Sequence, residues 1–200
     1  MKYSVKIIFT SAIIAIAVFF STAQAQTWQG LRIAPEQRCA EYVRKDYAYP
    51  ASVEDAIIAQ MGGVIYSPYT GEIFESQKET DIEHIVAVSE AHDSGLCASD
   101  KQTKRDFARD LLNLTLASPA VNRCSTSGKC AKDAADWLPQ YNSCWFAGRV
   151  IAVRQKYQLS IDLAEVQTLE EVLSHCTDMT MLAAEQLRQD EPQILAMNSR

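Results

Sequence analysis

Six cysteines that follow an N-terminal export signal constrain this chain more than any other feature of its sequence. Of the 200 residues, the first 25 contain a short basic start, an apolar stretch from Ile7 to Phe20 and the small residues of Ala23-Gln24-Ala25. This order is typical of a secretory signal peptide cleaved after Ala25, and the apolar stretch is shorter than the ~20 residues that span a membrane. We therefore predict a mature protein of residues 26–200 that is secreted or periplasmic.

All six cysteines lie in the predicted mature chain, at Cys39, Cys97, Cys124, Cys130, Cys144 and Cys176. An even number of cysteines in an exported protein indicates disulfides rather than zinc thiolates. Six cysteines allow 15 pairings, and the sequence alone does not select one. Proximity in sequence favours Cys124 with Cys130, neighbouring predicted helices favour Cys144 with Cys176, and Cys39 is then left with Cys97.

Apolar residues at helical spacing surround a short β-branched region in the middle of the chain. A strand–turn–strand pattern covers residues 64–74, an extended run covers residues 82–88, and the tail after Arg188 is polar and expected to fray. We expect a mostly helical α+β protein with a small central sheet, of a size that suits one domain. The predicted helices are residues 35–47, 52–61, 101–112, 132–138, 143–157 and 163–176.

The charge of the chain is uneven along its length. The formal net charge is −6, and loss of Lys2 and Lys6 with the signal peptide makes it −8. Residues 101–132 nevertheless hold seven basic and only two acidic residues. Such a segment can bind a polyanion locally, although an acidic protein steers one poorly over long range. The alternative is that these charged residues only form a solvent-exposed helix face.

A histidine stands beside a carboxylate in the stretch TDIEHIVA, which covers residues 80–87. His84 and Glu83 would point to opposite faces of a regular strand, but at a strand end or bend both can approach one site. A histidine in an apolar strand is more often structural than catalytic. The residues that follow it therefore decide between the two interpretations.

Polar residues of the types used in phosphodiester hydrolysis follow this histidine in order. Asn113 lies within the apolar run LLNLTL, where its amide needs a backbone or imidazole partner, and Asn122 and Arg123 precede Lys129 and Lys132. Hydrolysis of a phosphodiester needs a base near neutral pH, oxygen ligands for a hard cation and cationic groups for the phosphates.

Taken together, these motifs resemble those of the HNH endonucleases, in particular the secreted branch that shares a domain with the GmrSD-type restriction enzymes. The resemblance extends from about Gly63 to Cys176 and rests on TDIEHIVAVSEAHDSG, FARDLLNLTLA, VNR, KDAADWLP, NSCWFA and LEEVLSHC. It implies a ββα-metal fold, in which a hairpin and a helix surround one divalent cation, over about residues 63–132. Helices within residues 35–61 and 133–188 would flank this core in a single domain of residues 26–200.

The resemblance also implies roles for individual residues and a nucleic acid substrate, with DNA favoured. His84 would be the general base, and Asn113 would help to orient it. Glu83 and Asn122 would bind the metal, with Asp81 behind them as an outer acid. The residues implied to contact phosphates are Arg123, Lys129 and Lys132.

Three positions depart from the commonest pattern of the family. Glu83 stands where aspartate is usual, Ala87 where proline is common and Asn122 where histidine is expected. An amide oxygen in place of an imidazole favours Mg²⁺ or Mn²⁺ over Zn²⁺, although zinc stays open.

Two other functions compete with the nuclease. The first is a disulfide-stabilised, secreted nucleic-acid-binding protein that derives from an inactive nuclease, for which the net charge and Glu83 argue. The second is a zinc hydrolase that uses His84 and His92. We expect His92, in the polar stretch AHDSG, to be exposed at a helix end.

Overall fold

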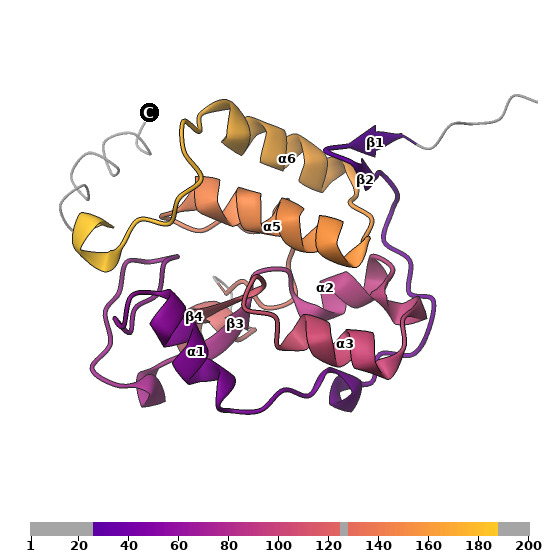
Figure 1. Cartoon of the computed structure of the whole chain (residues 1–200). Coiled ribbons are helices and arrows are strands. Elements are labelled where there is room, and N and C mark those ends of the chain that lie inside the picture. The colour runs from indigo at the N-terminus through magenta and orange to yellow at the C-terminus, as the bar shows by residue number, and fades with distance from the viewer. Residues whose placement is uncertain (1–25, 125–127, 188–200) are drawn as a thin grey trace, which may run out of the picture.

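Two helical layers enclose a small sheet. The computed structural model describes residues 26–124 and 128–187, so that the predicted signal peptide, the middle of the Cys124–Cys130 loop and the polar tail lie outside it. Helices α5 (Ser143–Tyr157) and α6 (Leu163–Ser174) lie side by side above the sheet in Figure 1, with helices α1, α2 and α3 below them. Among the described residues, no helix is long and apolar enough to cross a membrane.

The other elements are short. The helices of the lower layer are α1 (Val53–Gln60), α2 (Val88–Asp93), α3 (Lys101–Ala108) and α4 (Pro119–Asn122). The strands form two antiparallel pairs, β1 (Thr27–Trp28) with β2 (Leu31–Arg32) and β3 (Asp81–His84) with β4 (Leu114–Ala117). Single 3-10 turns are η1 (Arg44–Tyr47), η2 (Gln77–Glu79) and η3 (Leu96–Ala98). These elements confirm the predicted α+β class.

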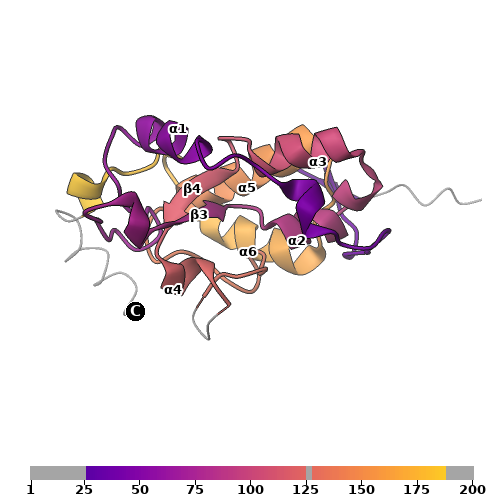
Figure 2. The same cartoon turned by 90° about the horizontal axis from the view of Figure 1, so that it is seen from below.

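The central sheet and the helix after it form a compact ββα unit. Strands β3 and β4 pair in antiparallel register, with Asp81 opposite Ala117 and His84 opposite Leu114. Helix α4 follows β4 at once and contacts β3, and Figure 2 shows it on the side of the sheet away from α1. The two strands are distant in sequence because α2 and α3 are inserted between them.

Local capping explains where the longer helices begin and end. Asp100 and Asp162 accept hydrogen bonds from the backbone N–H groups of Thr103 and Glu165, and so they satisfy free donors at the starts of α3 and α6. Helix α5 ends at Gln158, whose left-handed conformation (φ +54°) is typical of helix C-termini.

Three disulfides join these elements. They pair Cys39 with Cys97, Cys124 with Cys130 and Cys144 with Cys176, and the Cα–Cα distances are 5.6, 4.7 and 5.7 Å. These are the three pairs favoured in the sequence analysis. Cys144–Cys176 links the start of α5 to the end of α6, and Cys39–Cys97 ties the N-terminal segment to η3.

The predicted helix at residues 35–47 is wrong. Only η1 forms there, and the chain before it is extended along α2. The backbone N–H of Gln37 donates to the carbonyl of Asp93 at 2.8 Å, and the guanidinium of Arg38 donates twice to the Asp93 carboxylate. These tertiary contacts, together with the Cys39–Cys97 disulfide, replace the bonds that a helix would make internally.

Two further predicted elements are reduced to turns. The hairpin expected at residues 64–74 keeps one antiparallel bridge, between Tyr66 and Ile73, and the sheet of the ββα unit is built from β3 and β4 instead. No helix forms at residues 132–138, because the Asp133 carboxylate accepts from the backbone N–H groups of Ala135 and Asp136 and closes a tight turn.

A network of charges is buried where α2, α5 and α6 meet. Arg154 of α5 is 1% exposed and forms ion pairs with Glu90 (2.6 Å) and Glu165 (2.5 Å). At the edge of this network, exposed Glu36 and half-buried Asp133 each place one carboxylate oxygen within 4.8 Å of the other and of buried Glu90. A hydrogen bond with Glu90 raises the pKa of Glu36 to about 8, and burial raises the pKa of Glu165 to about 7.

We expect this network to lower the free energy of unfolding as pH rises. A carboxyl whose pKa is raised in the folded protein holds a proton that the unfolded chain has lost, so its stabilising effect disappears between its ordinary pKa and its folded pKa. The Glu36→Gln variant keeps a donor for Glu90 but does not titrate. Urea unfolding at about pH 5 and about pH 8 should therefore show a smaller loss of stability in this variant than in the parent. Equal losses of stability in the two proteins would contradict a proton held between Glu36 and Glu90 in the folded protein.

Candidate functional site

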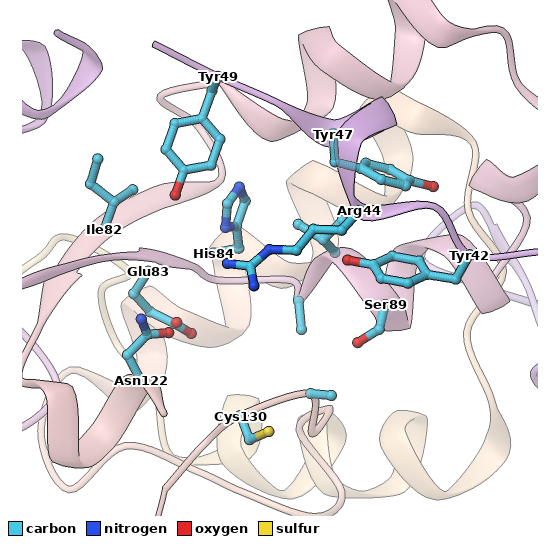
Figure 3. A pocket seen from close by; sticks show the side chains of 13 residues that line it. Tyr42, Arg44, Tyr47, Tyr49, Ile82, Glu83, His84, Ser89, Asn122 and Cys130 are labelled. Carbon is cyan, nitrogen blue, oxygen red and sulfur yellow. The ribbon is translucent and has the colours of Figure 1, made fainter. Parts of the chain in front are cut away.

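A cavity of about 400 Å³ opens at the end of strand β3, within the range of ordinary ligand sites. Its walls come from the N-terminal segment, β3, the start of α2, α4 and the Cys130 region, as Figure 3 shows. It contains three of the residues predicted to be functional, Glu83, His84 and Asn122. The other residues that line it are Tyr42, Arg44, Tyr47, Tyr49, Ile82, Ala87, Val88, Ser89, Cys130 and Ala131.

One nitrogen of His84 is fixed and the other is left as an acceptor. Nε2 lies 2.9 Å from the carbonyl oxygen of Ala108, the last residue of α3, whose carbonyl has no partner within the helix. Since a carbonyl can only accept, Nε2 carries the hydrogen. Nδ1 is then unprotonated, and among the described residues it has no hydrogen-bond partner.

The surroundings of His84 keep the ring neutral. The ring lies parallel to Phe107 and edge-on to Tyr49. The pKa of His84 is lowered to about 4: burial is the main cause, the Ala108 carbonyl opposes it, and the charge of Lys129 adds a smaller lowering effect. At neutral pH the imidazole is therefore unprotonated, and the lone pair of Nδ1 is available.

Asn113 holds the backbone that follows the histidine. Its side chain is fully buried, its Oδ1 accepts from the N–H of Val86 at 2.7 Å, and its Nδ2 donates to the carbonyl of Val86 at 3.1 Å. Its own carbonyl accepts from the N–H of Ile85. The amide thus has backbone partners, and these contacts fix the chain two residues beyond His84 rather than the imidazole itself.

Glu83 lines the cavity but is paired with a buried lysine. Its carboxylate is 3% exposed, and its Oε1 lies 3.0 Å from Nζ of Lys129, which also donates to the carbonyl of His84 at 3.0 Å. Oε1 makes no hydrogen bond of good geometry with any residue that the structure describes. Burial raises the pKa of Glu83, and Lys129 opposes that rise.

Asp81 sets the orientation of Asn122. The carboxylate accepts from Nδ2 of Asn122 at 3.1 Å and binds Arg123 through two hydrogen bonds, which lower the pKa of Asp81. Since the NH₂ group of Asn122 faces Asp81, its carbonyl oxygen is left for the cavity. Figure 3 shows the amide of Asn122 beside the carboxylate of Glu83.

The donor set of this cavity fits a hard divalent cation. It offers one carboxylate, one amide oxygen and the free nitrogen of His84. Carboxylate and amide oxygens suit Mg²⁺ and Mn²⁺. Lys129 already neutralises part of the charge of Glu83, so the site holds less negative charge than its carboxylate alone would give.

The predicted phosphate contacts are placed differently from one another. Lys129 is fully buried and faces protein atoms, which removes it from the candidate phosphate ligands. The Arg123 side chain is 69% exposed but engaged with Asp81, and Lys132 is half-buried outside the cavity lining. For Arg123 and Lys132 the contact stays a prediction.

Three residues of the cavity wall were missed in the sequence. Tyr42, Arg44 and Tyr49 belong to the N-terminal segment, far from β3 along the chain. Tyr42 and Arg44 fall within the helix predicted at residues 35–47, Tyr49 follows it, and no local pattern indicated that they belong to the site. Only the tertiary contacts of this segment bring them to His84.

The expectation for His92 is wrong, because this residue is fully buried. Its Nδ1 lies 2.6 Å from the hydroxyl of Tyr47, and its Nε2 lies 2.9 Å from the carbonyl of Ala40. Both nitrogens are thus occupied within the protein. A zinc site formed by His84 and His92 has no support in this geometry.

Known proteins are similar to this chain over most of its length. The family described as "GmrSD restriction endonucleases, C-terminal domain" matches residues 37–169. An uncharacterized secreted protein of Arthroderma benhamiae is 30% identical over 124 residues, which are 61% of this chain. The aligned part is 60% of the length of that relative. None of the solved structures matches this chain.

Proposed function

The chain belongs to the family of GmrSD restriction endonuclease C-terminal domains, and from this premise we propose a secreted or periplasmic, metal-dependent endonuclease of HNH type. Its substrate would be nucleic acid, with DNA as the first candidate. The observation that supports this most is His84, a neutral imidazole whose free Nδ1 shares a cavity with the carboxylate of Glu83 and the amide oxygen of Asn122. The three disulfides and the secreted relative support an oxidising compartment.

In this proposal His84 is the general base. Its Nδ1 accepts a proton from water, the water attacks phosphorus, and the bond to the 3′ oxygen breaks. The Ala108 carbonyl, which holds Nε2, stabilises the ring when it becomes positively charged. Asn113 fixes the backbone beyond the histidine, and Asp81 presents the carbonyl of Asn122 to the cavity.

The metal would be held by Glu83 and Asn122. A divalent cation bound there would offset the negative charge that develops on the phosphate and on the leaving oxygen. Because the site contributes one carboxylate that is partly neutralised by Lys129, we expect its affinity for magnesium to be low.

We expect cleavage to require a divalent metal ion in excess. Supercoiled plasmid should be nicked in Mg²⁺ or Mn²⁺, more slowly or not at all in Zn²⁺, and not in EDTA. Cleavage should return when magnesium is added back beyond the chelator. The measurement is the appearance of nicked and linear plasmid on a gel with the purified, oxidised protein. Undiminished nicking in EDTA would contradict a role for the metal.

The ion pair between Glu83 and Lys129 favours a second candidate function. A lysine that permanently neutralises the carboxylate is what a nuclease relative without its metal would have. The protein would then bind nucleic acid and not cut it. Binding of DNA by the folded protein without cleavage in any of the three metals would support this alternative.

A further inference from the structure

We propose that the N-terminal segment forms a phosphate-binding wall, in which Arg44 and the hydroxyls of Tyr42 and Tyr49 hold a backbone phosphate of the substrate beside His84. This inference rests on the proposed function, because it concerns the substrate of the same cavity. Arg44, Tyr42 and Tyr49 would then bind the polyanion, whereas the sequence analysis assigned the phosphate contacts to other residues.

Arg44 carries a cationic group that is free to bind. Its side chain is exposed and lines both the cavity of His84 and a neighbouring one formed by Glu54, Asp81 and Arg123. Figure 3 shows its guanidinium extended over the cavity toward His84. Within residues 26–124 and 128–187, no hydrogen bond or ion pair engages this side chain, in contrast to Arg123 and Lys129. A planar guanidinium suits the two oxygens of a phosphate.

Two tyrosine hydroxyls complete the wall. Tyr42 and Tyr49 line the cavity, and Figure 3 shows their hydroxyls directed into it. Neither hydroxyl has a hydrogen-bond partner among the described residues, whereas that of Tyr47 is bound to His92. Burial raises the pKa of Tyr42 and of Tyr49, so both remain protonated donors. These donors line the same cavity as Glu83 and Asn122.

The contacts of this segment hold the wall in register with His84. The Cys39–Cys97 disulfide fixes the chain before Arg44. After Arg44, the hydroxyl of Tyr47 meets Nδ1 of His92, and the same ring holds the carbonyl of Ala40. His92 therefore bridges both sides of Arg44 and anchors them to α2, which begins four residues after His84. The two internal hydrogen bonds of His92 thus position the segment that carries Arg44.

The test is the affinity for a fluorescent DNA oligonucleotide, measured by anisotropy in the His84→Ala background so that cleavage does not interfere. Arg44→Ala should weaken binding about 10-fold or more, as expected for loss of a charged hydrogen bond. The slope of log affinity against log salt should fall by about 0.7 to 0.9, the value for one phosphate contact. Arg44→Lys should recover part of the affinity, because it restores the charge without the planar fork.

Arg32→Ala is the matched control. Arg32 is an exposed arginine of β2 outside the cavity, so its loss changes the net charge equally. It should leave the affinity and the salt slope close to those of the parent. Because no hydrogen bond or ion pair engages the Arg44 side chain in the part of the chain that the structure describes, its removal should also leave the melting temperature unchanged.

The outcomes separate this inference from the proposed function. Equal affinity and equal salt slopes for Arg44→Ala and Arg32→Ala would overturn the phosphate-binding wall, even if the wild type cuts DNA. A parent that binds no oligonucleotide would also overturn it. Selective weakening by Arg44→Ala in a protein that cuts nothing would retain the wall and reject the nuclease.

Discussion

We expect the His84→Ala variant to cleave nucleic acid about 10²- to 10⁴-fold more slowly than the wild type, the usual effect of removing a general base. The imidazole is neutral, its Nε2 is fixed by the Ala108 carbonyl, and its Nδ1 faces the cavity. Alanine leaves nothing there to accept the proton of the attacking water. The measurement is the single-turnover rate of cleavage of a labelled DNA duplex in magnesium.

His175→Ala is the control for this experiment. His175 lies at the end of α6 with 74% of its side chain exposed, and its described contact is with Glu171. Its loss should leave the rate unchanged. Since the His84 ring also packs against Phe107, urea unfolding must show that the His84→Ala variant is folded under the assay conditions. Wild-type turnover by a folded His84→Ala variant would contradict the role of this residue.

We expect the Lys129→Met variant to lose about 3–5 kcal/mol of its free energy of unfolding, the cost of leaving a buried charge without its partner. Nζ of Lys129 and the carboxylate of Glu83 are both buried and lie 3.0 Å apart. Methionine has a similar length but cannot neutralise Glu83 or donate to the His84 carbonyl. Urea unfolding of the two proteins at neutral pH measures the difference.

Two further variants serve as a control and as a rescue for Lys129→Met. Lys132→Met removes the same charge from a half-buried position outside the cavity lining, and it should cost much less. Addition of Glu83→Gln to Lys129→Met removes the unpaired charge and should recover part of the lost stability. Equal stabilities of Lys129→Met and Lys132→Met would show that the buried ion pair does not contribute as described.

The parts of the fold with strong local signals were predictable from the sequence. The 143–157 helix matches α5, and the helix at 163–176 matches α6 to within two residues, because both have sustained helical spacing. The segment 35–47 has similar spacing but forms only the 3-10 turn η1. Its conformation is decided by the disulfide to Cys97 and by hydrogen bonds to α2, which no local pattern reveals.

Part of the candidate site was predictable from the order and spacing of its motifs in the sequence. His84, Glu83 and Asn122 do share one cavity, and Asp81 does lie behind Asn122. The burial of Lys129 against Glu83 could not be predicted, because burial of a lysine depends on a partner that is remote in sequence. Arg44 could not be assigned to the cavity either, because only tertiary contacts bring it close to His84.

The most direct test of the account is to let the wild type cut a DNA oligonucleotide in ¹⁸O-labelled water with magnesium and to analyse the product ends by mass spectrometry. If water activated by His84 attacks phosphorus and the 3′ oxygen leaves, each new 5′-phosphate should contain one ¹⁸O atom and the 3′-hydroxyl ends should be unlabelled. Label in 3′-phosphates, or no cleavage by the folded, oxidised protein in any of the three metals, would contradict the central claim.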